Sequence, residues 1–206
     1  MVEQARFTAD VVVLGGGPAG MCAAIAAARA GAKTILVEQG GSCGGMATQG
    51  LVGPFMTCYD RKGERMMIRG LFAEIVDRMV AKGGALHPSQ VRAGTPYTSW
   101  ITVGHDHVTP YEPECLKLVV DELLTEAGVQ VLYHTQFLRP ILSGNTLTAV
   151  EVASKAGVER IEGRIFIDGT GDGDVQLWDC ARGRQLRSLR GCHAGRVGAA
   201  AWSGFM

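Results

Sequence analysis

The chain has 206 residues, of which 47% are hydrophobic, enough for one domain with a substantial core or for a domain with an appended segment. Twenty basic residues balance twenty acidic residues, so the composition offers no electrostatic case for binding nucleic acid or an anionic membrane. No basic region precedes the first apolar stretch, and glycines and Pro18 interrupt that stretch. We therefore expect neither a signal peptide nor a membrane span. We expect the protein to be cytoplasmic.

The first recognisable unit is residues 10–20, with the sequence DVVVLGGGPAG. Its apolar run predicts a strand buried in a parallel sheet, and the alanine-rich residues 21–30 predict a helix that Gly31 ends. The glycines between them have the spacing G-x-G-x-x-G, which turns the chain sharply, leaves room for a pyrophosphate and lets the helix pack closely. An anion would lie at the helix N-terminus. The predicted cofactor-binding residues here are Gly15, Gly17, Pro18, Ala19 and Gly20.

A second apolar strand is predicted over residues 34–37, directly before Glu38. Glu38 stands 18 residues after Gly20, about where a dinucleotide fold places the carboxylate that binds a ribose. We predict that Glu38 and the adjacent Gln39 contact the cofactor. The same pattern suits NAD as well as FAD, and a βαβ unit without a ligand is the remaining alternative.

The turn GGGPAG, the acid at Glu38 and the segment GGMATQGLVGPFM over residues 44–56 together carry a family resemblance. Residues 7–174 resemble the FAD-dependent oxidoreductases of the glutathione-reductase and fumarate-reductase type, most of all a bacterial group with a GGMAT-type loop. The resemblance implies that Gly44, Gly45 and Met46 pass the FAD pyrophosphate and flavin, and that Glu38 holds the adenosine ribose. It also implies hydride transfer from a small-molecule substrate to flavin N5, with an external electron acceptor; the sequence specifies neither molecule.

The six cysteines are scattered, at positions 22, 43, 58, 115, 180 and 192, without a C-x-x-C pair. Some members of the resembled family carry a 4Fe–4S cluster, but this spacing supports neither such a cluster nor a zinc site, so we predict no metal. Cys43 is a candidate redox residue, although the second cysteine of the thiol reductases does not follow it. A buried, inert thiol is the simpler interpretation.

Residues 70–83 predict an amphipathic helix, and residues 85–110 predict a long irregular loop that carries several aromatic and histidine side chains. In the resembled family this insertion helps to build the substrate side. His105 and His107 are therefore candidate proton donors, and solvated loop histidines are the alternative.

The second half of the domain begins with a predicted helix over residues 113–128 and a predicted strand over residues 129–137. The resemblance implies that the strand's last residues, Gln136 and Phe137, pair their backbone with the adenine. A hairpin follows over 147–154 and 158–161, and a further strand over 164–168 returns to the parallel sheet. This strand ends in an ATG-like turn that would approach the cofactor again, formed by Gly169, Thr170 and Gly171.

The character of the sequence changes after Asp174. Residues 175–206 resemble a WD-repeat fragment, with Trp178–Asp179 as the dipeptide, and HAGRVGAAAWSG is similar to the fizzy-type co-activators of the anaphase-promoting complex. A helix capped by Asp174 is the alternative for the same segment. About one blade cannot close a propeller, so we do not expect this tail alone to bind a protein partner.

Taken together, the sequence predicts an α/β fold with a Rossmann-like parallel sheet over residues 1–174, incomplete against the resembled family, and a short C-terminal tail. The predicted function is that of an FAD-dependent oxidoreductase in a truncated or fused form, with weak FAD binding and impaired activity. The alternatives are a non-catalytic fragment or interaction module that uses the tail, and an NAD-binding protein.

Overall fold

The computed structural model of the chain describes residues 7–60, 62–96 and 106–175. The candidate His105 and the segment 176–206 lie outside the described residues, so the choice between a WD-repeat fragment and a helix falls outside them too. Asp174 and Val175, the last described residues, have helical backbone.

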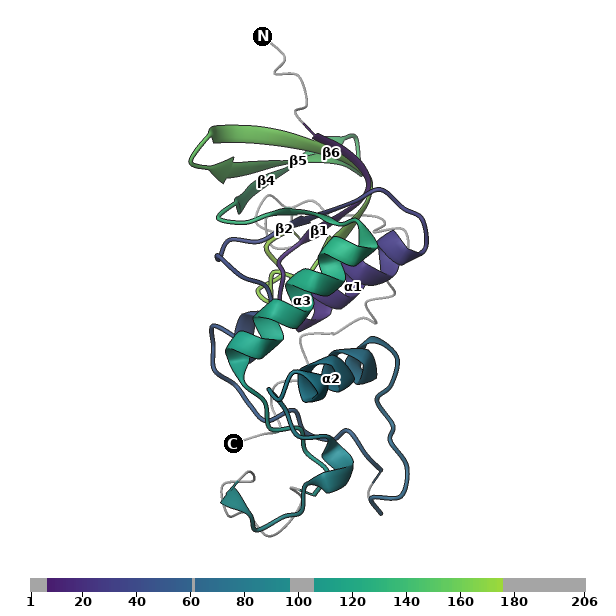
Figure 1. Ribbon diagram of the computed structural model, residues 1–206. Helices are drawn as coiled ribbons and strands as arrows, with labels where there is room; N and C mark the ends of the chain where they lie inside the picture. The colour runs from purple at the N-terminus through teal and green to yellow at the C-terminus, as the bar shows by residue number, and fades with distance from the viewer. Residues whose placement is uncertain (1–6, 61, 97–105, 176–206) are drawn as a thin grey trace, which may run out of the picture.

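Six strands form one mixed sheet in the order β3-β2-β1-β6-β5-β4 (Figure 1). The strands β3, β2, β1 and β6 run parallel, and β6, β5 and β4 continue the sheet as an antiparallel ribbon. The predicted α/β fold with a parallel dinucleotide-type sheet is confirmed. The strands are β1 (Phe7–Leu14), β2 (Thr34–Val37), β3 (Gln130–Leu132), β4 (Gln136–Ser143), β5 (Thr146–Ser154) and β6 (Gly157–Asp168).

In the described part of the chain the sheet is accompanied by the helices α1 (Pro18–Arg29), α2 (Leu71–Ala81) and α3 (Pro113–Ala127). The helix α1 packs on β1 and β2, α3 packs on α1, and α2 packs on α3 on the side away from the sheet (Figure 1). The predicted end of α3 is confirmed, because Gly128 takes the left-handed conformation with φ 76°. Short 3₁₀ turns occupy Gly45–Ala47 and Pro88–Gln90.

The alternation of side chains along β1 separates two apolar cores. Val11 and Val13 face the helices, whereas Val12 and Leu14 face a second core that the ribbon supplies through Val150, Val152 and Ile161. Both faces of the parallel strands are therefore covered, which explains why β1 and β2 are continuous apolar runs.

The predicted strand 129–137 is wrong at its C-terminal end. The strand β3 ends at Leu132, the chain then turns with His134 at φ 50°, and Gln136 begins β4. The rest of β4 does not follow from the sequence, because Pro140 argues against a strand; β4 accommodates this proline as the edge strand of the sheet.

The segments predicted as two strands, 158–161 and 164–168, form the single strand β6. Its first half pairs with β5 and its second half pairs with β1, so one continuous strand joins the antiparallel ribbon to the parallel sheet. The predicted return to the parallel sheet is confirmed. Within the described residues, no helix combines the length and apolarity that crossing a bilayer requires.

Candidate functional site: a glycine-lined cradle at the start of α1

Three glycine-containing turns meet at the carboxyl ends of the parallel strands. The amide of Gly15 donates to Val37 O at 2.8 Å, and the amide of Gly169 donates to Leu14 O at 2.7 Å. These bonds extend the sheet past the ends of β1, β2 and β6, so the turns that follow are held together. The predicted sites around Gly15 and Gly169 therefore belong to one place in the fold.

The three glycines of the first motif have different environments. A Cβ at Gly15 would lie 2.4 Å from Gly169 O, and one at Gly20 would lie 1.8 Å from Gly15 O, so packing excludes any side chain at both positions. A Cβ at Gly17 would meet nothing within 4 Å. The chain packs closely around an open space at Gly17, which is the arrangement that lets a ligand approach the backbone.

The open space lies at the N-terminus of α1. Gly17 is the N-cap residue, no side chain caps the helix, and no acidic residue stands in its first turn. Pro18 occupies the first turn, and both Pro18 and Ala19 are exposed. The first-turn amides have no partner within the helix, and the helix dipole favours an anion there.

We call the open space at Gly17 and the turns around it the cradle. The loop after β2 forms its second wall. The amide of Gly44 donates to Gly16 O at 2.8 Å, and a Cβ at Gly45 would lie 3.0 Å from Gly17 Cα. Gly44 has φ 105° and Gly45 has φ 49°, conformations that favour glycine. Met46 follows with 62% of its surface exposed, so an apolar side chain stands beside the cradle.

The carboxylate of Glu38 joins the glycine turn after β1 to the loop after β2. Its Oε2 accepts from the Gly16 amide and its Oε1 from the Gly40 amide, each at 2.6 Å, and the residue is 8% exposed. The predicted proximity of Glu38 to the start of α1 is present. Because each carboxylate oxygen has a further acceptor site, these bonds leave Glu38 able to accept from a sugar hydroxyl.

A hollow of about 860 Å³ lies beyond Glu38. It brings together Gln39 and Gln136, which the sequence placed in separate motifs, whereas Phe137 packs against the second core. His134 and Lys155 also line this hollow; no sequence pattern predicts them, because only the turn after β3 and the β5–β6 turn bring them here. The lining residues are Gln39, Gly40, Gln49, Tyr133, His134, Gln136, Ala153, Ser154, Lys155 and Ala156.

The turn over Gly169, Thr170 and Gly171 is fixed by Asp168. Its Oδ1 accepts from the Thr170 amide at 3.1 Å and hydroxyl at 2.7 Å, and its Oδ2 accepts from the Val175 amide at 3.2 Å. The hydroxyl of Thr170 also accepts from the Asp174 amide at 3.1 Å. Thr170 therefore shapes the turn after β6. A Cβ at Gly171, with φ 88°, would meet nothing within 4 Å.

Cys43 does not have the environment of a redox thiol. Its side chain is buried, and burial raises the pKa of the thiol to about 11, so the sulfur stays protonated at neutral pH. The described cysteines are all free, and the reactive form of cysteine is the thiolate. A Cβ at Gly16 would lie 2.7 Å from Cys43 Sγ, so the thiol packs against the glycine loop.

His107, the described member of the two histidine candidates, is held by its neighbours. Its ring stacks on Tyr59 with 4.6 Å between centroids, Nδ1 lies 3.1 Å from Pro88 O, and Nε2 lies 3.0 Å from Arg92 Nη1. A guanidinium only donates, so Nε2 accepts and Nδ1 donates to the carbonyl. In this arrangement both ring nitrogens of His107 have a protein partner.

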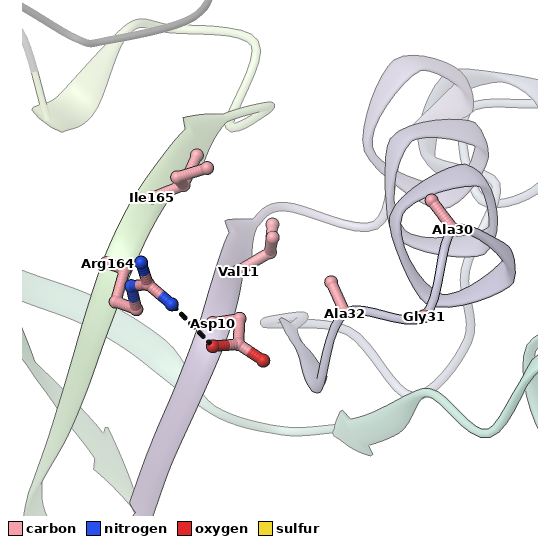
Figure 2. Close-up of a pocket in the computed structure, with 7 residues that line it drawn as sticks. All are labelled: Asp10, Val11, Ala30, Gly31, Ala32, Arg164 and Ile165. Atoms are coloured by element: carbon pink, nitrogen blue, oxygen red, sulfur yellow. Dashed lines mark ion pairs between the residues drawn. The ribbon is translucent and has the colours of Figure 1, made fainter.

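Among residues 7–60, 62–96 and 106–175, no group of three His, Cys, Asp or Glu side chains is placed to bind a metal ion. A second hollow, of about 540 Å³, lies at the C-terminal end of α1, beside the middle of β1 (Figure 2). Arg164 and Asp10 form its polar wall, with 3.6 Å between Nη1 and Oδ1. It is open, and it lies away from the glycine-lined cradle.

Comparison with known families decides the identity of this fold. Residues 10–178 match the family model described as FAD dependent oxidoreductase. The chain belongs to this family. The open space at Gly17, next to uncapped amides at the start of α1, has the chemistry of an anion site.

Solved structures show the same fold at low sequence identity. A geranylgeranyl bacteriochlorophyll reductase-like protein from Thermoplasma acidophilum is 21% identical, with a TM-score of 0.51 over 84% of this chain and 42% of that chain. A 3-ketosteroid-delta4-(5alpha)-dehydrogenase from Rhodococcus jostii RHA1 is 15% identical, with a TM-score of 0.53 over 81% and 47%. THI4 from Thermovibrio ammonificans is 16% identical, with a TM-score of 0.53 over 83% and 61%.

Curated relatives give a different and partial likeness. Cell division cycle 20.1 of Arabidopsis thaliana, a cofactor of the APC complex, is 40% identical over 77 residues, which are 35% of this chain and 17% of that protein. Cell division cycle 20.5 from the same plant is 39% identical over 77 residues. The chain thus spans about one sixth of these relatives, and their likeness agrees with the resemblance to fizzy-type co-activators.

Proposed function

We propose that this chain binds FAD through its ADP half, as part of a two-electron oxidoreductase. One observation carries the proposal: a side chain at Gly17 would meet open space, although Gly15, Gly20 and Gly45 around it are closely packed. A helix N-terminus without a capping side chain faces the same space. A diphosphate satisfies both features, because it accepts hydrogen bonds from amides and carries negative charge.

The two ends of the cradle suggest an orientation for the dinucleotide. The adenosine would lie toward Glu38 and the hollow lined by Gln39 and Gln136, which offers amide and hydroxyl groups. The flavin would lie toward Met46, where exposed apolar side chains include Leu51 and Val52. When bound, FAD would supply the hydride-accepting chemistry, while the residues of this chain bind and orient it.

The loop that would face the flavin has a fixed shape. The hydroxyl of Tyr111 lies 2.8 Å from both Ala47 O and Val52 O, and its ring stacks on Phe55 with 4.3 Å between centroids. A prearranged loop loses little conformational entropy when a ligand binds. This supports our proposal that residues 46–52 contact the flavin half of the cofactor.

We further propose that the 206 residues alone bind FAD weakly. The three solved structures compared above extend well beyond the matched region, which covers 42% to 61% of their chains. A chain that contacts chiefly the ADP half would gain little binding energy from the flavin.

Calorimetric titration of the full chain tests both statements. We expect ADP and FAD to bind with dissociation constants within about tenfold of each other, above 1 µM, and FMN not to bind. Binding of FMN without ADP would contradict recognition through the ADP half. A submicromolar constant for FAD would contradict weak binding, and binding of NAD in preference to FAD would favour the NAD-binding alternative.

The likeness to APC cofactors motivates a second candidate function, a protein-binding role for residues 175–206. Cell division cycle 20.6 of Arabidopsis thaliana is 49% identical over 35 residues, which are 17% of this chain. The test is binding of a peptide partner to the full chain and to a chain that ends at Asp174. A partner retained by the shortened chain would exclude this role.

A further inference from the structure

Three side chains form a hydrogen-bonded relay behind the glycine loop. Tyr133 follows β3, Asp121 lies on α3 and Cys43 lies in the loop after β2. The phenol oxygen of Tyr133 is hydrogen-bonded to Asp121 Oδ1 and lies 3.6 Å from Cys43 Sγ. Because a carboxylate only accepts and a phenol has one proton, Tyr133 donates to Asp121 and accepts from the Cys43 thiol.

Cys43, one end of this hydrogen-bonded chain, packs against Gly16 in the glycine turn after β1. Cys43 Sγ lies so close to Gly16 that a Cβ there would be 2.7 Å from it. Gly16 is also held by its amide, which donates to Glu38, and by its carbonyl, which accepts from Gly44. The thiol therefore completes the set of contacts that fixes the residue immediately before the open position Gly17.

We propose that Tyr133 is a positioning residue for the nucleotide site. It holds the Cys43 thiol against Gly16 and thereby keeps the amides at the start of α1 directed at the ligand. The effect on ligand affinity rests on the proposed function, whereas the effect on the loop rests on the described contacts alone. The hydroxyl provides both hydrogen bonds, so its removal leaves the ring as packing and frees the thiol.

The experiment replaces Tyr133 with phenylalanine in the full chain. We expect ADP to bind about threefold to tenfold more weakly by calorimetry, the range for one or two lost hydrogen bonds. We also expect faster hydrogen exchange in peptides covering residues 15–17 and 43–45. The matched control is Tyr59→Phe, which removes a tyrosine hydroxyl from a ring that stacks on His107, and it should change neither quantity. Unchanged affinity and unchanged exchange in Tyr133→Phe would overturn the proposal.

A double-mutant cycle separates positioning from direct ligand contact, because Tyr133 also lines the hollow beside Glu38. Cys43→Ala should weaken ADP binding as well, and the double variant should lose no more than the weaker-binding single variant. Additive losses would mean that Tyr133 acts on the ligand itself, which would overturn the positioning role.

Two further outcomes are distinguishable. If the unmodified chain does not bind ADP, the proposed function fails, and hydrogen exchange alone decides the relay: faster exchange in Tyr133→Phe supports it, and unchanged exchange overturns it. If Tyr133→Phe does not fold, Asp121→Asn replaces it, since a weaker acceptor at the exposed end should also speed exchange over residues 15–17. No change in Asp121→Asn would then overturn the proposal.

Discussion

Glu38 Oε2 accepts a hydrogen bond of 2.6 Å from the backbone amide of Gly16, 22 residues earlier in the chain. The other carboxylate oxygen accepts from Gly40 at the same distance. The acid expected to bind a ribose thus also organises the loop that would bind the phosphates. The proposed ligand binding and the stability of the loop would therefore depend on the same carboxylate.

Replacing Glu38 with glutamine should therefore weaken both properties. A glutamine side chain keeps one acceptor, but its NH₂ group would face one of the two amides, leaving a buried donor unsatisfied. We expect the free energy of unfolding in urea to fall by about 1 to 3 kcal/mol and ADP binding to weaken. Glu64→Gln, on an exposed loop, is the control and should leave both unchanged.

Two glycine variants should separate packing from ligand access. Gly17→Ala places a methyl group in the open space, so we expect a stability loss of no more than about 1 kcal/mol, from a poorer N-cap, and at least tenfold weaker ADP binding. Gly20→Ala places its methyl 1.8 Å from Gly15 O, so we expect a larger stability loss, about 1 to 3 kcal/mol or more. Calorimetry and urea denaturation measure the two effects. Unimpaired ADP binding by Gly17→Ala would argue against a diphosphate at this position.

Buried thiols should make the fold sensitive to alkaline pH. Burial raises the pKa of Cys43 to about 11 and also raises that of Cys58. Below about pH 9 the thiols are protonated in both states, so their contribution is fully present. Above it the unfolded chain loses protons first, so the free energy of unfolding falls between pH 9 and 11. Cys43→Ala should reduce the fall in the free energy of unfolding between pH 9 and 11 by at most about 3 kcal/mol. An unchanged slope in this variant would place the titration elsewhere.

An ion-pair network should hold α2 on the other helices. Glu74 of α2 accepts from Arg29 of α1 at 2.7 Å and from Arg78 at 3.0 Å, and Arg78 also pairs with Glu126 of α3 at 2.7 Å. Because the network is largely exposed, we expect Glu74→Gln to lower the melting temperature by about 2 to 4 °C at low salt, and less in 1 M NaCl. Lys117→Met, which removes a pair within α3, is the control.

The same network sets a dependence on acidic pH. The Arg29 guanidinium hydrogen-bonded to Glu74 lowers the pKa of that carboxyl. Its stabilisation is therefore present above the pKa of the unfolded chain and is lost as the pH falls through the lowered folded value. The difference in melting temperature between the unmodified chain and Glu74→Gln should shrink as the solution is acidified below about pH 4. A difference that persists there would exclude the ionised carboxylate as its cause.

Local patterns predicted the elements that position the site. The run Val11–Leu14, the glycine spacing and the alanine-rich helix specify β1, the turn and α1, because each depends on residues close together in the chain. The acid after β2 follows from its fixed distance to the glycines. The apolar spacing of 70–83 and 113–128 likewise predicted α2 and α3.

Predictions failed where a distant partner decides the backbone. The chain leaves β3 after Leu132 because the amide of Thr135 donates to Glu38 O at 3.0 Å, a contact that no local pattern reveals. Pro140 lies in a strand because its strand is at the edge of the sheet. Both outcomes depend on the order of strands.

The sequence by itself determined that a glycine-rich turn joins a buried strand to a helix, and that an acid follows the next strand, because these depend on spacing along the chain. Only the tertiary structure decided that Glu38 clasps Gly16, that Cys43 packs behind it, and that Tyr133 links that thiol to α3. Such contacts join residues 12 to 90 positions apart, and the parallel sheet brings them to one edge, where hydrogen bonding and close packing fix their geometry.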